Sequence, residues 1–306
     1  MSDGNSLINF GDISKPAVVL IEKISDAIGG LSKPSQIRRI ARAEADAERI
    51  KAINQLEISE LQRRALNRFL LEEAKKQDNI ESITAKALPC LREDADPKSV
   101  EDDWITNFFD KCRLISDKQM QSLWAKLLAG EANSPGSYSK RTIDILGSLD
   151  KTDALLFSTL CRFSWFLDQV FPFPLVYNEQ DSIYTDHGIS FDALEHLDSI
   201  GLINFSLIGV YERTGLPKHY PAFYYEAAIN IEFPAGENNQ LELGHVSLTK
   251  AGQELSLICA SEPIPDFLEY ILSRWKDNKL IVSCPYPLNS PVTRNIQIET
   301  AQHIDN

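Results

Sequence analysis

The sequence predicts a mainly α-helical protein with a small β component, in which a long N-terminal helix and a helical domain precede a winged-helix-like α+β domain. Two observations lead to this fold class. Residues 35–76 contain no glycine or proline and are rich in strong helix formers. Residues 191–203 predict a helix followed by a strand, and residues 243–255 predict a strand followed by a helix, which is the order of a winged helix-turn-helix.

Length and composition indicate an ordered protein of about two domains. The chain has 306 residues, of which 43% are hydrophobic, and a formal net charge of −13. The negative charge argues against undirected binding to nucleic acid or anionic membranes, because both need a basic surface. We expect four segments: an amphipathic N-terminal segment (1–34), the long helix with the helical domain (35–148), the winged-helix-like domain (149–284) and a flexible tail (285–306).

The first two helices are predicted from their apolar spacing. Residues 13–31 carry one apolar stripe, so we expect a short amphipathic helix that could also touch a membrane surface. The helix over about 35–76 would be roughly 60 Å long, more than a domain of this size can cover. Its first half is expected to project, and its second half, with apolar residues between Ile53 and Leu70, is expected to pack.

The remaining helical domain is predicted to contain three helices with an aromatic core. They are expected over 80–91, 102–115 and 116–132, the last with Ser116 as its N-cap and Gly130 at its end. The expected core residues are Trp104, Phe108, Phe109, Leu123, Trp124, Leu127 and Leu128.

In the second domain, the sequence predicts helices around a β-hairpin. A helix over 153–167 precedes the candidate recognition helix at 190–200, and alternating stretches at 202–212 and 221–233 are expected to pair. A helix after Thr249 and a final one within 265–278 complete the domain. The residues expected to be buried are Leu194, Leu197, Ile203, Leu248 and Leu255.

No set of residues predicts a catalytic, cofactor or metal site. The five histidines lack metal-binding spacing, and no phosphate-binding glycine motif or nucleophile elbow is present. The five cysteines are scattered without CxxC spacing, which is typical of reduced, buried thiols in a cytoplasmic protein. No apolar run is long enough to span a membrane.

The candidate interface lies at the start of the long helix. Arg38 and Arg42 share one face and could contact phosphate, a lipid headgroup or an acidic protein; the alternative is a solvated surface balanced by neighbouring acidic residues. A thin apolar stripe beside them would be covered by a second copy or another protein. The predicted interface residues are Ile37, Arg38, Ile40, Arg42, Ile50 and Ile53.

Binding of DNA through the candidate recognition helix is a less favoured alternative. That helix carries Asp192, Glu195 and Asp198 and no lysine or arginine. A helix that enters the major groove presents basic or amide side chains to phosphates and bases. The acidic helix is therefore expected to serve protein contact or packing.

Residues 123–146, LWAKLLAGEANSPGSYSKRTIDIL, resemble a bacterial family whose domain has no known function. In that family a similar helix follows a segment like DDWITNFFDKCRLISD, and SLTKAGQEL at 247–255 matches its closing region. The LWAKLLA-type helix also resembles the abortive-infection alpha proteins of phage defence. The resemblance implies a helical domain and a winged-helix-like domain encoded among bacterial accessory genes, with antiviral defence as the setting, and it assigns no catalytic residues. Because helices of the expected length gain most of their stability from packing, we expect a non-enzymatic protein that acts by protein association. An enzyme with an unrecognised site is the third alternative.

Overall fold

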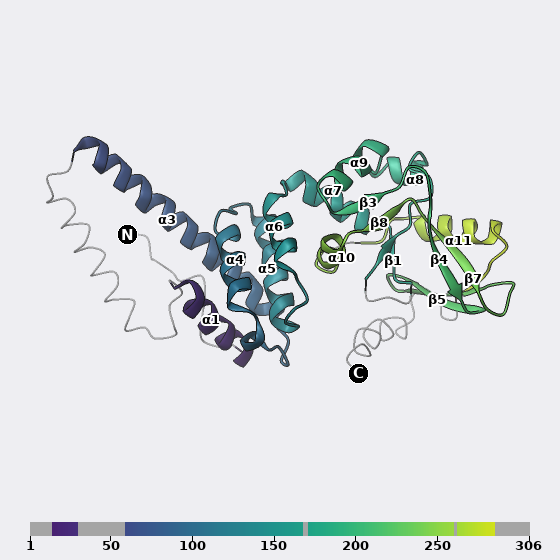
Figure 1. Ribbon diagram of the computed structural model, residues 1–306, viewed down its shortest axis with the longest axis horizontal. Helices are drawn as coiled ribbons and strands as arrows, with labels where there is room; N and C mark the ends of the chain where they lie inside the picture. The colour runs from purple at the N-terminus through teal and green to yellow at the C-terminus, as the bar shows by residue number, and fades with distance from the viewer. Residues whose placement is uncertain (1–13, 30–58, 168–170, 260–261, 285–306) are drawn as a thin grey trace. The chain divides into compact units, whose positions relative to one another are not determined.

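The computed structural model describes residues 14–29, 59–167, 171–259 and 262–284 (Figure 1). The chain divides into two compact units, Met1–Gly147 and Ser148–Asn306. The first unit is helical in its described part, and the second combines helices with small antiparallel sheets. The protein is therefore mainly α with a smaller β component.

The first described helix, α1 (Lys15–Ile28), is amphipathic and lies in the core of the first unit. The Ser14 hydroxyl caps it by accepting a hydrogen bond from the Ala17 amide at 3.4 Å. Its apolar stripe packs against α4 (Asp102–Cys112) and is almost completely buried, with Leu20 and Ile24 at 0% exposure. A membrane contact through this stripe would require it to leave the core.

The long helix begins and ends later than the sequence predicts. Helix α3 runs without interruption over Glu60–Ala87. Ser59 is its N-cap residue and has an extended backbone. The Ser59 hydroxyl accepts from the Gln62 amide at 3.3 Å, while the Gln62 side chain accepts from the Ser59 amide at 2.9 Å. This capping box satisfies two amides that the first turn leaves unpaired. The predictions of one unbroken helix over 35–76 and a separate helix over 80–91 are therefore wrong.

The core of the first unit lies where the second half of α3 packs against α4 and α5 (Lys118–Asn133). Phe108 and Trp124 meet edge to face at 5.1 Å, and both are fully buried. The aromatic core is confirmed except at Leu123, which is only half-buried. Asp117 is the N-cap of α5 instead of Ser116, because its carboxylate accepts from the Gln119 and Met120 amides at 2.9 and 3.0 Å.

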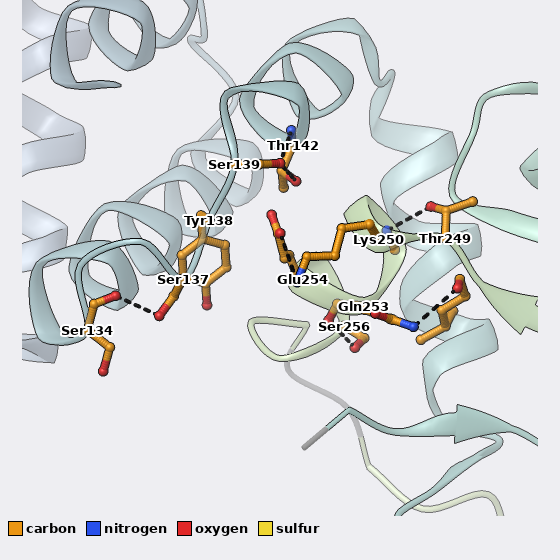
Figure 2. Close-up of polar contacts among 12 residues, drawn as sticks. Ser134, Ser137, Tyr138, Ser139, Thr142, Thr249, Lys250, Gln253, Glu254 and Ser256 are labelled. Atoms are coloured by element: carbon orange, nitrogen blue, oxygen red, sulfur yellow. Dashed lines mark hydrogen bonds and ion pairs between the residues drawn. The ribbon is translucent and has the colours of Figure 1, made fainter. Parts of the chain in front are cut away.

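Helix α5 continues past Gly130, and the side chain of Glu131 holds the loop that follows the helix. A side chain at Gly130 would collide with the ring of Tyr138, so this position needs glycine for close packing and does not end the helix. The buried Glu131 carboxylate accepts from the Gly136 and Tyr138 amides at 2.7 and 2.9 Å. The loop then leads into α6 (Lys140–Ser148), where the hydroxyls of Ser139 and Thr142 are 3.0 Å apart (Figure 2).

The helices of the second unit surround an aromatic core. Trp165 meets Trp275 at 4.9 Å, and Phe163 meets Phe267 at the same separation. Helix α7 ends at Cys161, before the position that the sequence predicts, because β1 (Ser164–Trp165) follows and pairs with β2 (Phe173–Pro174). The helices are α7 (Lys151–Cys161), α8 (Ser182–Thr185), α9 (Phe191–Ser199), α10 (Lys250–Ser256) and α11 (Phe267–Asp277).

The strands between α9 and α10 form three nested antiparallel pairs. The innermost pair joins β5 (His219–Tyr224) to β6 (Ala227–Glu232), and β9 (Ile281–Ser283) adds to β6. Around it, β4 (Tyr211–Leu216) pairs with β7 (Asn239–Gly244), and the outermost pair joins β3 (Ile203–Phe205) to β8 (Val246–Leu248). The predicted pairing of 202–212 with 221–233 is wrong. The strands that precede Tyr225, β5, β4 and β3, pair in turn with β6, β7 and β8, which follow it.

Helix α10 starts where β8 ends and packs closely on the neighbouring strand. The Thr249 hydroxyl accepts from the Gly252 amide at 3.1 Å and caps the helix. A side chain at Gly252 would fall on the Leu202 carbonyl oxygen, so the SLTKAGQEL motif needs glycine there. Lys250 and Glu254, one turn apart, form an ion pair at 3.5 Å (Figure 2). The burial predicted for Leu194, Leu197, Ile203, Leu248 and Leu255 is confirmed.

Candidate interaction surface

The first half of α3 exposes large apolar side chains to solvent. Between Ser59 and Lys75 every residue is exposed except Leu66, which is half-buried. Leu61 is 69% exposed, and Phe69 is 58% exposed. The sequence predicts that this stretch is packed, and the structure contradicts that prediction.

The exposed apolar residues lie on the same face that forms the core further along the helix. Residues 18 positions apart in an α-helix are about five turns apart and share a face. Leu61, Ala65 and Phe69 are separated in this way from Asn79, Ile83 and Ala87, which are at most 3% exposed. The face that packs on α4 and α5 in the second half of α3 thus continues uncovered over the first half. We call the residues Leu61, Ala65, Leu66 and Phe69 the α3 apolar face.

Charged residues flank this face and are paired within the helix. Arg63 lies 3.6 Å from Glu60, and Arg68 lies 3.4 Å from Glu72. All four side chains are exposed, and such pairs stabilise a helix by at most a few tenths of a kcal/mol. These ion pairs reduce the net charge that a binding partner would meet beside the α3 apolar face.

The interface residues predicted from the sequence, Ile37, Arg38, Ile40, Arg42, Ile50 and Ile53, lie outside the described residues. The α3 apolar face begins eight residues after the last of them. The signal that identifies it is the apolar spacing at 61, 65, 66 and 69, combined with the capping box at Ser59 that precedes the helix.

The candidate recognition helix α9 exposes an acidic face. Leu194 and Leu197 are buried, whereas Asp192, Glu195 and Asp198 are exposed. One Asp198 oxygen accepts a hydrogen bond from the backbone amide of Phe205 at 3.1 Å, so this carboxylate also ties α9 to β3. The helix carries no lysine or arginine that could pair with a phosphate.

A second, smaller apolar surface lies in the loop between β3 and β4. Leu207 and Ile208 are exposed at its tip. The loop is held by His245, whose Nδ1 lies 3.1 Å from the Ser206 carbonyl oxygen and 3.2 Å from that of Gly209. Both partners can only accept, so Nδ1 carries the proton.

The second unit contains a cluster of two buried tyrosines and one half-buried tyrosine. Burial raises the pKa of Tyr177 and of Tyr184 far above the usual range, and it raises the pKa of Tyr270 to about 12. The Arg274 guanidinium lies 4.2 Å above the Tyr177 ring, and the Tyr270 hydroxyl donates to Asp181 at 2.7 Å. These phenols stay protonated and donate hydrogen bonds, so the cluster supports packing instead of proton transfer.

Metal-binding and membrane-spanning features were sought in the described part of the chain. Within residues 14–29, 59–167, 171–259 and 262–284, histidine, cysteine and acidic side chains do not gather in threes as a metal ion would require. Among the same residues, each helix is too short or too polar to cross a bilayer.

Comparison with known families places the chain in one of them. Residues 63–272 match the family model described as a protein of unknown function (DUF2806), and this match covers more than half of the chain. The chain therefore belongs to this uncharacterised family. No curated protein and no solved structure matches the sequence.

Proposed function

We propose that the protein acts by protein–protein association, with no catalytic step, and that the α3 apolar face is the contact surface. The observation that carries this proposal is the continuation of the buried face of α3 into an exposed stripe, with Phe69 at 58% exposure. Clustered apolar side chains on a soluble surface are typical of interaction sites. Helices of this kind gain most of their stability from packing against another element.

The spacing of the stripe favours a second copy of the chain as the partner. Leu61 and Phe69 lie four residues before and after Ala65 and share one face with it. Two antiparallel copies related by a twofold axis at Ala65 would place Leu61 of each copy against Phe69 of the other.

The mass of the intact protein in solution tests this proposal. The wild-type chain of 34.4 kDa should scatter light as a dimer, and the double substitution Leu61→Asp, Phe69→Asp should convert it to a monomer. Leu71→Asp is the matched control, because Leu71 is 72% exposed but points away from the α3 apolar face. A monomeric wild-type protein, or equal dissociation by Leu71→Asp, would overturn the proposal.

The biological setting that we propose is antiviral defence in a bacterium. Its support is the sequence resemblance of the helix at residues 123–146 to abortive-infection proteins, together with a surface that suits assembly. Expression in a phage-sensitive bacterium should reduce the number of plaques, and the Leu61→Asp, Phe69→Asp variant should restore it. Equal plaque numbers with and without the wild-type gene, over a broad set of phages, would count against this setting.

A winged-helix arrangement in the second unit is the alternative basis for function. The order of α7, α8, α9, β3, β8 and α10, with β3 paired to β8, supports it, although the nested strands extend far beyond a simple wing. DNA binding through α9 is disfavoured by its acidic surface. Anisotropy of labelled duplex DNA should show no submicromolar binding; tight, salt-sensitive binding lost on changing α9 would instead favour a regulator.

A further inference from the structure

The loop between β3 and β4 carries apolar side chains at its tip that extend into solvent. Ile208 is fully exposed, at 102%. Its neighbours Leu207 and Val210 are also exposed, so three apolar side chains lie within four consecutive positions. Single exposed apolar residues are ordinary on a protein surface, but exposed apolar side chains that gather in one place are typical of interaction sites.

Hydrogen bonds hold this loop in one conformation. The Ser206 amide donates to the His245 carbonyl at 2.9 Å, and His245 Nδ1 donates to the carbonyls of Ser206 and Gly209. The Gly209 amide closes the turn by donating to the Ser206 hydroxyl at 3.2 Å. A loop that is held in place before binding loses less conformational freedom on binding than a mobile loop does. The apolar tip is therefore already in position for a contact.

The surface that adjoins the loop is acidic. Helix α9 packs against β3, which leads directly into the loop (Figure 1). The rings of Phe191 and Phe205 meet edge to face at 5.5 Å, and the Phe205 amide donates to Asp198, so α9 and the end of β3 are tied together. Exposed carboxylates follow one another along α9 about one turn apart, at Asp192, Glu195 and Asp198. Neither α9 nor residues 206–210 contain a lysine or arginine.

From this arrangement we infer that the loop at residues 206–210 and the acidic face of α9 together bind a basic amphipathic segment of another protein. Leu207 and Ile208 supply the apolar contact, and the carboxylates of α9 attract lysine or arginine side chains beside the apolar residues of that segment. Nucleic acid and anionic lipid fit this surface poorly, because the same carboxylates repel phosphate groups. The surface belongs to the second unit, so it adds a partner beyond the association through the α3 apolar face.

Selection from a library of displayed random peptides tests this surface. The full-length protein is immobilised at low salt, and peptides are kept that bind the wild type but not Ile208→Ser. These peptides should combine apolar residues with a net positive charge. In fluorescence anisotropy, the synthesised peptides should bind Ile208→Ser about tenfold more weakly than the wild type, as expected for loss of a central apolar contact. Their affinity for the wild type should fall as salt is added.

Matched variants separate the apolar contribution from the charged one. Ile281→Ser is the control for Ile208→Ser, because Ile281 is an exposed isoleucine on β9 of the same unit, and this change should leave peptide binding unaltered. The double substitution Asp192→Asn, Glu195→Gln keeps the apolar tip and should weaken the binding of the basic peptides several-fold, with a smaller dependence on salt.

Three results would overturn the inference. The first is a selection that yields no peptide able to distinguish the wild type from Ile208→Ser. The second is a set of peptides that depend on Ile208 but carry no net positive charge. The third is flotation of the wild-type protein, but not of Ile208→Ser, with phosphatidylcholine vesicles, which would assign the apolar tip to a lipid surface instead of a protein.

Discussion

Phe69 and Ala87 occupy the same face of α3, about five turns apart, yet Phe69 is 58% exposed and Ala87 is completely buried. The helix therefore carries one continuous apolar face with two environments. Burying a large aromatic side chain from this position would contribute about 1.5–3 kcal/mol. That contribution is available only to a partner, and it is the physical basis of the association that we propose.

Replacing Gly252 by alanine should destabilise the protein, although alanine is the better helix former by about 1 kcal/mol. The new methyl group would collide with the Leu202 carbonyl oxygen, and such overpacking costs about 1–3 kcal/mol. Chemical denaturation measures the change. Gly236→Ala, where the methyl group would meet open space, should shift the free energy of unfolding by less than about 0.5 kcal/mol.

Leu197→Ala should lower the free energy of unfolding by about 2–5 kcal/mol, because Leu197 is completely buried on the inner face of α9. Leu207→Ala serves as the control in the same unit, since Leu207 is 62% exposed. Thermal and urea unfolding of both variants would measure the difference. Equal, small effects would mean that the buried face of α9 is assigned incorrectly.

Asp153 should make stability depend on pH in the acidic range. The hydrogen bond from His196 at 2.8 Å is the main cause that lowers the pKa of Asp153 below its ordinary value of 3.8. A lowered pKa means that this stabilisation is complete above pH 3.8 and is lost as the pH falls through the folded-state pKa. Wild type should therefore exceed Asp153→Asn in stability at pH 7, and the difference should shrink below about pH 4.

Urea unfolding at a series of pH values measures this difference. Glu237→Gln, in the exposed loop between β6 and β7, is the control and should track the wild type at each pH. A difference between wild type and Asp153→Asn that stays constant down to pH 3 would contradict the assignment.

Ser59→Ala should loosen the start of α3 while leaving the core intact. The substitution removes the hydroxyl that accepts from the Gln62 amide, which costs about 1 kcal/mol of local helix stability. Hydrogen exchange at the amides of residues 61–64 should therefore speed up several-fold. The amides of Gln119 and Met120, capped by Asp117, provide an internal control and should exchange at the wild-type rate.

Local signals in the sequence predict the order of elements well where capping and apolar spacing agree. The helix-strand and strand-helix junctions at α9–β3 and β8–α10 are confirmed, because Leu197, Leu202 and Leu248 follow the spacing of a buried face. The start of α3 is missed because Ser59 interrupts a run of helix formers without glycine or proline. Its signal is the serine-to-glutamine spacing of a capping box.

Strand pairing and exposure depend on the fold as a whole, so the sequence predicts them poorly. Alternation marks residues 221–233 as extended, but it does not say that β3 pairs with β8. Apolar spacing likewise identifies the face that carries Leu61 and Phe69, but not whether anything covers it.

The nesting of the strand pairs has a consequence for how the second unit acquires its structure. The tight turn at Tyr225 can bring β5 and β6 together first, since they are adjacent in the sequence. Each further pair then closes only a short additional length of chain, from β4 with β7 to β3 with β8. This order would let Ile203 and Leu248 meet without the entropy of closing the whole intervening loop in one step. Changes at the turn should accordingly alter the rate at which β3 pairs with β8.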